Sequence, residues 1–247
     1  MNLRLAIWGL LGFMISALAY SDCTKQSCPI ESRIKIAIID TGVRSRLDLL
    51  PFLCKTGHQD FTNSSHGIED THGHGTTIAW LLTRNLDPQK YCILIYKFYQ
   101  SNSWGHNNLA NEIKSLRAAI SERAKYINLS GGGQQPSVEE QMLFTEALEK
   151  GVHVAVAAGN HSMDLGKNCT YHPACLNTNS PNFYVVGNCR DGKYYESSNY
   201  GGPVKQCRDG LLQGPDNLKM SGTSQATAIF LNELIIKEGK PVNGTTH

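Results

Sequence analysis

Short apolar runs alternate along this chain with longer segments in which apolar residues recur every three to four positions. The apolar runs lie at 33–39, 91–98, 126–129, 152–158 and 183–187. Runs of this length, bounded by turn residues, predict buried strands. Helical spacing occurs over 107–124, over 137–150 and after Ser224. The second helix opens on the capping sequence Ser137-Val138-Glu139-Glu140 and is closed by Gly151.

This alternation of strands and helices predicts an α/β fold with a mostly parallel sheet and helices on both faces. Asp40, Ser130 and Asn160 each follow the end of a predicted strand. The carboxyl ends of parallel strands meet at one edge of a sheet, where ligands bind in such folds. We therefore expect these three polar side chains at one edge.

The first residues have the character of a secretory signal. Met1 to Arg4 is positively charged, Leu5 to Ala19 carries no charge, and the run ends in Ala-Leu-Ala. This pattern predicts cleavage after Ala19, so that 1–19 is the signal peptide and 20–247 the folded domain. The alternative is an uncleaved membrane anchor, although the run is short for a span of about 20 residues.

Composition narrows the class of protein. The chain has 247 residues, 40% of them hydrophobic, with a formal net charge of +2 and no run of Lys and Arg that would indicate a nucleic-acid surface. Its eight cysteines all lie beyond the predicted signal. An even count in an exported chain predicts disulfides, whereas the spacings match no common zinc pattern. Local pairs such as Cys23–Cys28 and Cys169–Cys175 are candidates. The stretches 161–182 and 188–219 are predicted to be rich in loops.

Two segments carry candidate chemistry. In the polar stretch 70–76, His72 and His74 allow three interpretations: a metal site completed by His58, His66 or Asp70, a general base, or solvated loop histidines. Ser224, in the stretch Ser-Gly-Thr-Ser at 221–224, is either a nucleophile or the N-cap of the helix that follows.

Four blocks in order favour one interpretation. They are Asp-Thr-Gly at 40–42, His-Gly-His-Gly-Thr at 72–76, Ala-Ala-Gly-Asn at 157–160 and Ser-Gly-Thr-Ser at 221–224. Together with Ile-Asn-Leu-Ser-Gly-Gly at 127–132, they resemble the subtilisin-like serine proteases, whose catalytic residues follow the order Asp, His, Ser. The resemblance covers about 33–237 and implies a subtilisin-like three-layer fold, with 20–247 as a peptidase domain.

The resemblance also implies a role for each matching residue. Asp40 would orient His74, which would act as the base for Ser224, the nucleophile of a serine endopeptidase that works through an acyl-enzyme. Asn160 and the backbone N–H of Ser224 would stabilise the oxyanion. Ser130, Gly131 and Gly132 would bind the substrate backbone as an added strand. His72 would be a neighbour on the rim and Asp70 a loop carboxylate outside the triad.

Further expectations follow from the same resemblance. We expect a secreted or periplasmic protein that acts on a protein or peptide substrate, binds no nucleic acid, leaves the membrane after signal cleavage and is a monomer. No cofactor should be required, although structural calcium at an unlocated site is consistent with the family. The stretch from Tyr20 to Ile39 leaves no room for the pro-segment that the family usually carries. The alternative is therefore a non-catalytic or partner-activated peptide-binding relative.

Overall fold

A mostly parallel sheet forms the middle of the fold. The computed structural model describes residues 31–100, 108–215 and 219–240. The predicted signal peptide and Cys23–Cys28 lie outside these residues. The strands of the sheet are β1 (Ile34–Asp40), β2 (Gln59–Asp60), β3 (Tyr91–Lys97), β4 (Tyr126–Leu129), β5 (His153–Ala157), β6 (Phe183–Arg190), β7 (Lys193–Tyr194) and β8 (Val204–Arg208). Their order is β2-β3-β1-β4-β5-β6, with β7 and β8 both beside β6, and β7 alone is antiparallel to its neighbour.

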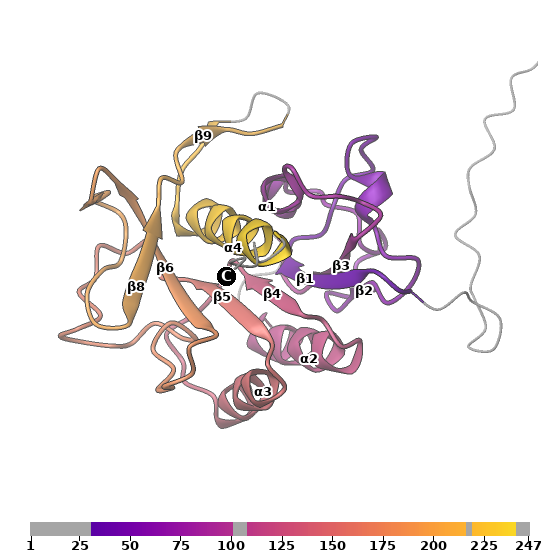
Figure 1. Ribbon diagram of the computed structural model, residues 1–247. Coiled ribbons are helices and arrows are strands. Elements are labelled where there is room, and N and C mark those ends of the chain that lie inside the picture. Colours follow the sequence, from indigo (N-terminus) through magenta and orange to yellow (C-terminus); the bar gives the residue numbers. More distant parts are fainter. Residues whose placement is uncertain (1–30, 101–107, 216–218, 241–247) are drawn as a thin grey trace, which may run out of the picture. The chain divides into compact units, whose positions relative to one another are not determined.

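Helices cover both faces of this sheet (Figure 1). One face carries α1 (His74–Thr83) and α4 (Thr223–Gly239), and the opposite face carries α2 (Asn108–Ser121) and α3 (Val138–Glu149). The remaining elements are a short 3-10 helix, Leu50–Phe52, and a two-stranded ribbon of β9 (Leu212–Gln213) and β10 (Lys219–Met220). The predicted three-layer fold is confirmed.

The unbroken apolar run of β1 follows from its burial on two sides. Ile36 and Ile38 pack in the core under α1 and α4, whereas Ala37 and Ile39 pack in the core under α2 and α3. Successive side chains of a strand point to opposite faces, so a central strand needs apolar residues at every position. Burying one such isoleucine contributes about 1.5–3 kcal/mol.

The strand order reverses between β1 and β4. From β1 the chain passes through α1 to β3 on one side, and then through α2 to β4 on the other side of β1. Parallel pairing places the carboxyl ends of β1 and β4 side by side. In doubly wound sheets this reversal opens a crevice at the carboxyl edge. Asp40, the last residue of β1, and Ser130, directly after β4, therefore lie where a site is expected.

Two stretches contain regular structure that the sequence pattern did not predict. The glycine-rich stretch 72–76 holds the start of α1, although its Gly, His and Thr residues lack an apolar helical pattern. The stretch 188–219 contains β8, in which only Val204 is buried. A strand with a single neighbour needs no apolar run, and the Cys189–Cys207 disulfide links this one to β6. The other predicted strands and helices are confirmed, and Ser137 caps α3 by accepting the Glu140 N–H.

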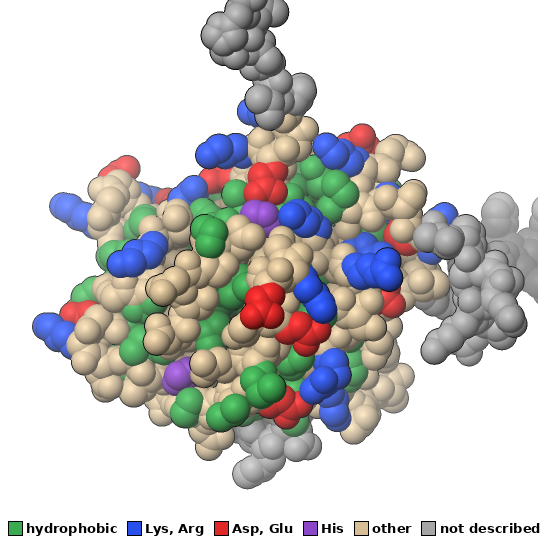
Figure 2. All heavy atoms as spheres, turned by 60° about the horizontal axis from the view of Figure 1, so that its bottom comes forward, with side chains coloured by type: hydrophobic (Ala, Val, Ile, Leu, Met, Phe, Trp, Pro, Cys, Tyr) green, Lys and Arg blue, Asp and Glu red, His purple; other side chains and the backbone are tan. Residues whose placement is uncertain are grey.

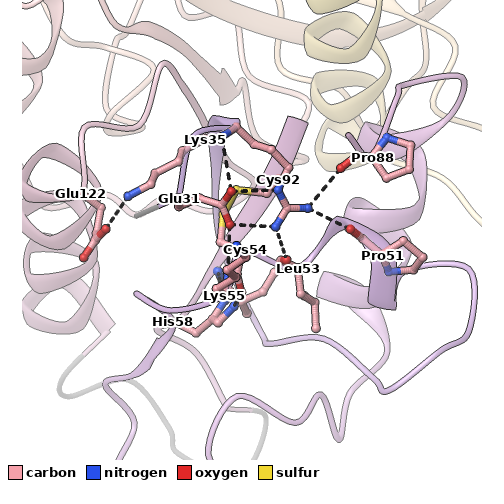
Figure 3. Close-up of a disulfide and its surroundings, with 12 residues drawn as sticks. Glu31, Lys35, Pro51, Leu53, Cys54, Lys55, His58, Pro88, Cys92 and Glu122 are labelled. Carbon is pink, nitrogen blue, oxygen red and sulfur yellow. Dashed lines mark hydrogen bonds and ion pairs between the residues drawn. A yellow bond between two sulfur atoms is a disulfide. The ribbon is translucent and has the colours of Figure 1, made fainter. Parts of the chain in front are cut away.

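Three disulfides link the described residues. They join Cys54 to Cys92, Cys169 to Cys175 and Cys189 to Cys207. The expected Cys169–Cys175 pair is confirmed. Figure 3 shows Cys54–Cys92, which ties the loop before β2 to β3.

Near this disulfide, the Arg33 guanidinium holds the pKa of Glu31 at about 2. Glu31 and these two sulfurs form the one group of three potential metal ligands in the described part of the chain. The disulfide removes both thiolates that such a site would need.

The surface has no dominant charge on the face seen in Figure 2, where basic and acidic side chains are interspersed. This agrees with the small net charge of +2. Within the described ranges, no helix has the length and apolar character needed to cross a membrane.

Candidate active site

The end of β1 and the start of α1 bring Asp40 and His74 together. His74 is the first residue of α1 and follows Gly73, whose φ of 96° is the left-handed conformation that glycine tolerates. Its ring Nδ1 lies 2.7 Å from Asp40 Oδ1, and the backbone N–H of Thr41 donates to the same oxygen at 2.7 Å. Asp40 is only 3% exposed. This buried carboxylate holds the imidazole in one orientation and leaves Nε2 as the nitrogen that can accept a proton.

The surroundings of His74 favour its charged form. Burial lowers the pKa of His74, but the charge of Asp40, their hydrogen bond and the charge of Asp70 outweigh burial, so that the pKa lies above its ordinary value. An imidazolium formed at this position is therefore stabilised. That is the property required of a base that must hold a proton during a reaction.

Asp70 connects the two segments that position this pair. It is 1% exposed, and its Oδ1 accepts the Thr41 hydroxyl at 2.9 Å and the backbone N–H groups of His72 and Gly73 at 2.9 and 2.8 Å. Its Oδ2 accepts the backbone N–H of Thr76 at 2.9 Å. Burial alone would raise the pKa of Asp70, but the hydrogen bonds from Thr76, Gly73 and Thr41 lower it below its usual value. Asp70 is a loop carboxylate, but it is also a buried positioning group that sequence analysis missed.

Ser224 is inside α4, not at its cap. The N-cap is Gly222, and Ser224 is the second residue of the helix. The alternative that Ser224 is the N-cap is therefore wrong. Its backbone N–H belongs to the first turn, where these groups have no partner within the helix and the helix dipole is positive.

The Ser224 hydroxyl contacts the strand side of the site. Its Oγ donates to the Ser130 carbonyl at 3.2 Å, and in the described part of the chain it has no hydrogen bond with His74. Ser224 is 8% exposed. A rotation about its Cα–Cβ bond would move Oγ away from Ser130. Hydrogen bonds between catalytic groups often form fully only when substrate is bound.

Asn160 stands beside the start of α4. It lies shortly after β5, is exposed, and its Oδ1 accepts the backbone N–H of Thr223 at 3.0 Å. This bond fixes the side-chain amide next to Ser224. The Nδ2 group has no hydrogen-bond acceptor within the described ranges, so it remains available as a donor.

A cleft of about 520 Å³ runs along the carboxyl edge of the sheet. Asp40, His72 and His74 line one part of it, and Ser130 to Gln135 line another. The backbone N–H and C=O groups of Gly131 and Gly132 form no hydrogen bond with other described residues, whereas Gly133 pairs with His172 at 2.8 and 2.7 Å. A Cβ on Gly131 would come within 2.7 Å of the Phe98 ring, which explains the need for glycine at this position.

The metal interpretation of His72 and His74 finds no third ligand among the described residues. The two rings lie 6.2 Å apart, with His72 exposed on the rim of the cleft. His58 is used elsewhere, because its Nε2 bonds the Cys54 carbonyl at 2.8 Å and its Nδ1 accepts the N–H of Ile95 at 3.1 Å. Both oxygens of the Asp70 carboxylate already accept hydrogen bonds from the protein. Over the described residues, no group of three potential ligands includes either histidine of the cleft.

Two buried glutamates also line the cleft, and sequence analysis did not assign them to it. They are Glu112 on α2 and Glu140 in the first turn of α3. Periodicity predicted both helices but gave no reason to place a carboxyl on their inner faces. The signal that was available is Glu140 itself, because it occupies the acidic position of the capping sequence and yet is 4% exposed.

Comparisons with known proteins identify the family of the chain. The model of the subtilase family matches residues 31–230. "Subtilisin-like serine protease Rho m 2.0101" of Rhodotorula mucilaginosa is 28% identical over 210 residues, which is 79% of this chain and 56% of that protein. "Subtilisin amylosacchariticus" of Bacillus subtilis subsp. amylosacchariticus is 27% identical over 152 residues, 58% of this chain and 38% of that protein. The chain thus spans between about a third and somewhat over half of the length of these curated relatives.

Solved structures share the fold. A cold adapted subtilisin-like serine proteinase superposes with a TM-score of 0.67 at 24% identity, over 83% of this chain and 76% of that one. A lanthipeptide protease gives the same TM-score at 19% identity, over 84% and 76% of the two chains. The family match covers most of the chain, and the chain belongs to the subtilase family.

Proposed function

We propose that this protein is a serine endopeptidase with Asp40, His74 and Ser224 as its catalytic triad. The observation that carries the proposal is the bond of 2.7 Å between the buried Asp40 carboxylate and His74 Nδ1, in a cleft that Ser130 shares. Ser224 is bonded to Ser130 in turn. An imidazole that a buried carboxylate orients is the group that activates a serine hydroxyl as a nucleophile.

The proposed reaction has two halves. Ser224 Oγ attacks the carbonyl carbon of the scissile bond while His74 Nε2 takes the hydroxyl proton. His74 then gives this proton to the leaving amine, the C–N bond breaks, and an acyl-enzyme remains. In the second half a water molecule attacks the ester, its proton passes through His74 to Ser224, and the acid product leaves. Asp40 stabilises the imidazolium in both halves.

Negative charge on the carbonyl oxygen would be stabilised by two donors. One is the Asn160 Nδ2 group, which the bond from Asn160 Oδ1 to the Thr223 N–H holds near the helix start. The other is the Ser224 backbone N–H. Donors fixed before reaction stabilise the transition state more than the ground state.

Ser130, Gly131 and Gly132 are proposed to bind the acyl side of the substrate as an added strand. This role is supported by the backbone of Gly131 and Gly132, which lines the cleft and forms no hydrogen bond with other described residues. An extended peptide can form main-chain hydrogen bonds with such a segment. This mode requires a protein or peptide substrate.

Several expectations belong to the same proposal. The reaction needs no cofactor, because the nucleophile, base and oxyanion donors are all side-chain or backbone groups of the chain. Structural calcium stays a prediction without located ligands. Export to the periplasm or the medium is supported by the three disulfides, since such bonds persist in oxidising compartments. A monomer and release from the membrane remain predictions.

The test is hydrolysis of a fluorescence-quenched peptide library by the purified, oxidised protein. We expect cleavage by the wild type and a loss of at least about 10⁴-fold in kcat for Ser224→Ala and for His74→Ala, on the scale established for subtilisin itself. Cleavage that survives in Ser224→Ala would refute the proposal. Peptide binding without cleavage by the wild type would instead support the alternative, a non-catalytic or partner-activated relative.

A further inference from the structure

Glu112 and Glu140 are neighbours in the lining of the cleft. Glu112 comes from α2 and Glu140 from the first turn of α3, where its backbone N–H is held by Ser137 Oγ at 3.2 Å. Each is 4% exposed, and both line the same cleft as His74 and Ser130. Fully buried glutamates are rare unless a partner compensates their charge.

No lysine or arginine among the described residues compensates the charge of this pair. Within the described residues, neither carboxyl forms an ion pair with Lys or Arg. The Glu112 side chain is hydrogen-bonded to that of Glu140, and Glu112 Oε1 is buried without any partner. An unsatisfied buried oxygen is costly, so its retention beside an open cleft indicates a ligand that supplies the missing donor.

The raised pKa values of Glu112 and Glu140 are consistent with a site that binds a cation. Burial, followed by the neighbouring Glu140, raises the pKa of Glu112 well above its usual value. Burial also raises the pKa of Glu140, although the Glu112 hydrogen bond and His172 oppose this rise. Burial therefore favours the protonated form of the pair when the cleft is empty. A cation placed beside it would favour the ionised form.

We propose that Glu112 and Glu140 form an acidic subsite that selects peptides with an arginine or lysine on the amino-terminal side of the cleaved bond. The proposal rests on the proposed function. His74 must protonate the leaving amine, so the carboxyl-side residues depart past His74. The acyl side lies along Gly131 and Gly132. A Cβ on Gly132 would meet Tyr171 and His172, which are the electrostatic neighbours of Glu112 and Glu140.

The walls of the cleft fit a long basic side chain. Phe98, Tyr99 and Leu109 line it together with the glutamates. Their apolar surfaces can cover the methylene stem of Arg or Lys, while the charged end reaches the carboxyls. A guanidinium presents a fork of donors that can meet both glutamates, which favours Arg over Lys.

The test measures peptide binding to Ser224→Ala protein, so that it does not depend on catalysis. Labelled peptides carry a single arginine at each position of the amino-terminal side in turn, and matched peptides carry norleucine. At one position we expect arginine to bind at least about tenfold more tightly, the size of one charge-assisted hydrogen bond. Adding Glu112→Gln or Glu140→Gln should abolish this preference. Adding Glu149→Gln, an exposed glutamate on α3, should leave it unchanged.

The subsite would be overturned by equal affinity for arginine and norleucine at every position, or by no measurable binding. It would also be overturned by an arginine preference that survives both Glu112→Gln and Glu140→Gln. Thermal unfolding of each variant shows that the fold is kept, which we expect because glutamine is the neutral isostere of a protonated glutamate. The two proposals fail separately. Arginine preference in binding without hydrolysis by the wild type would refute only the protease, and hydrolysis without the preference would refute only the subsite.

Discussion

At the scale of single residues, two buried aspartates have separate tasks. Asp40 contacts His74 directly, whereas Asp70 fixes the loop and the helix turn that carry the pair. Their partners show the difference. Asp40 is hydrogen-bonded to the His74 ring nitrogen as well as to the Thr41 N–H, whereas Asp70 accepts hydrogen bonds from hydroxyl and backbone groups. Substitution of each should therefore affect a different property.

Asp40→Asn should lower the pKa of His74. The substitution removes the charge and the hydrogen bond of Asp40, the main causes that raise this pKa, and leaves burial, which lowers it, opposed only by the charge of Asp70. In Ser224→Ala protein, titration of the imidazole by NMR should give a value above about 6.5 when Asp40 is present, and a lower value once Asp40→Asn is added. Because the base must be neutral, kcat/KM of the wild type should rise as pH increases through the raised value. An unchanged titration in Asp40→Asn would contradict the role of Asp40.

Asp70→Asn should lower the free energy of unfolding by about 3 kcal/mol at neutral pH, because an amide cannot accept all of the hydrogen bonds that Asp70 receives. The folded pKa of Asp70 is lowered, so its contribution is present above about pH 4 and is lost as pH falls through the lowered value. Urea unfolding at several pH values measures both effects. The control is Asp48→Asn, an exposed partner of Arg46 whose loss should cost at most about 1 kcal/mol.

Some residues of the candidate site could be predicted from the sequence, and others could not. The four motif blocks pointed to Asp40, His74, Asn160 and Ser224, and the structure places Asp40 against His74 and Asn160 beside the start of α4. Glu112 and Glu140 could not be found in this way. They are distant in sequence, and only the packing of α2 against α3 brings their carboxyls together.

At the scale of elements, α1 is a helix that the hydrophobic pattern of the sequence does not predict. Its first turn is defined by close contact with the loop after β1 and by the hydrogen bonds of Asp70, and neither leaves an apolar periodicity. The strands were easier to predict, since burial on both faces forces continuous apolar runs. The polar edge strand β8 has no such constraint.

Gly75→Ala tests the close packing of α1 on β1. A Cβ at Gly75 would overlap the Gly42 carbonyl oxygen and approach Asp40 Oδ1 to 3.1 Å. We expect a loss of about 1–3 kcal/mol in the free energy of unfolding, together with displacement of His74. Denaturant unfolding measures the loss. The control is Val138→Ala, at the 77% exposed first position of α3, which should change the free energy of unfolding by no more than about 0.5 kcal/mol. A Gly75→Ala protein as stable as the wild type would show that the turn can relax.

At the scale of the whole molecule, disulfides reinforce a sheet whose site lies at one edge. Cys54 and Cys92 are 38 residues apart in sequence, and Cys169 and Cys175 are 6 apart. In the chain-entropy model, the longer loop stabilises by about 4 kcal/mol and the shorter by about 2. Paired substitution by alanine should therefore lower the unfolding free energy more at Cys54 and Cys92. The reverse order in denaturant titrations would contradict this account.

The central claim is that Ser224 is an activated nucleophile. The most direct measurement is labelling of the purified, oxidised protein with a fluorophosphonate, with the adduct located by mass spectrometry and Ser224→Ala as control. The account predicts one adduct, on Ser224, that is absent from the variant and strongly reduced by His74→Ala. A folded protein that takes no label at Ser224, or takes it equally without His74, would contradict the triad.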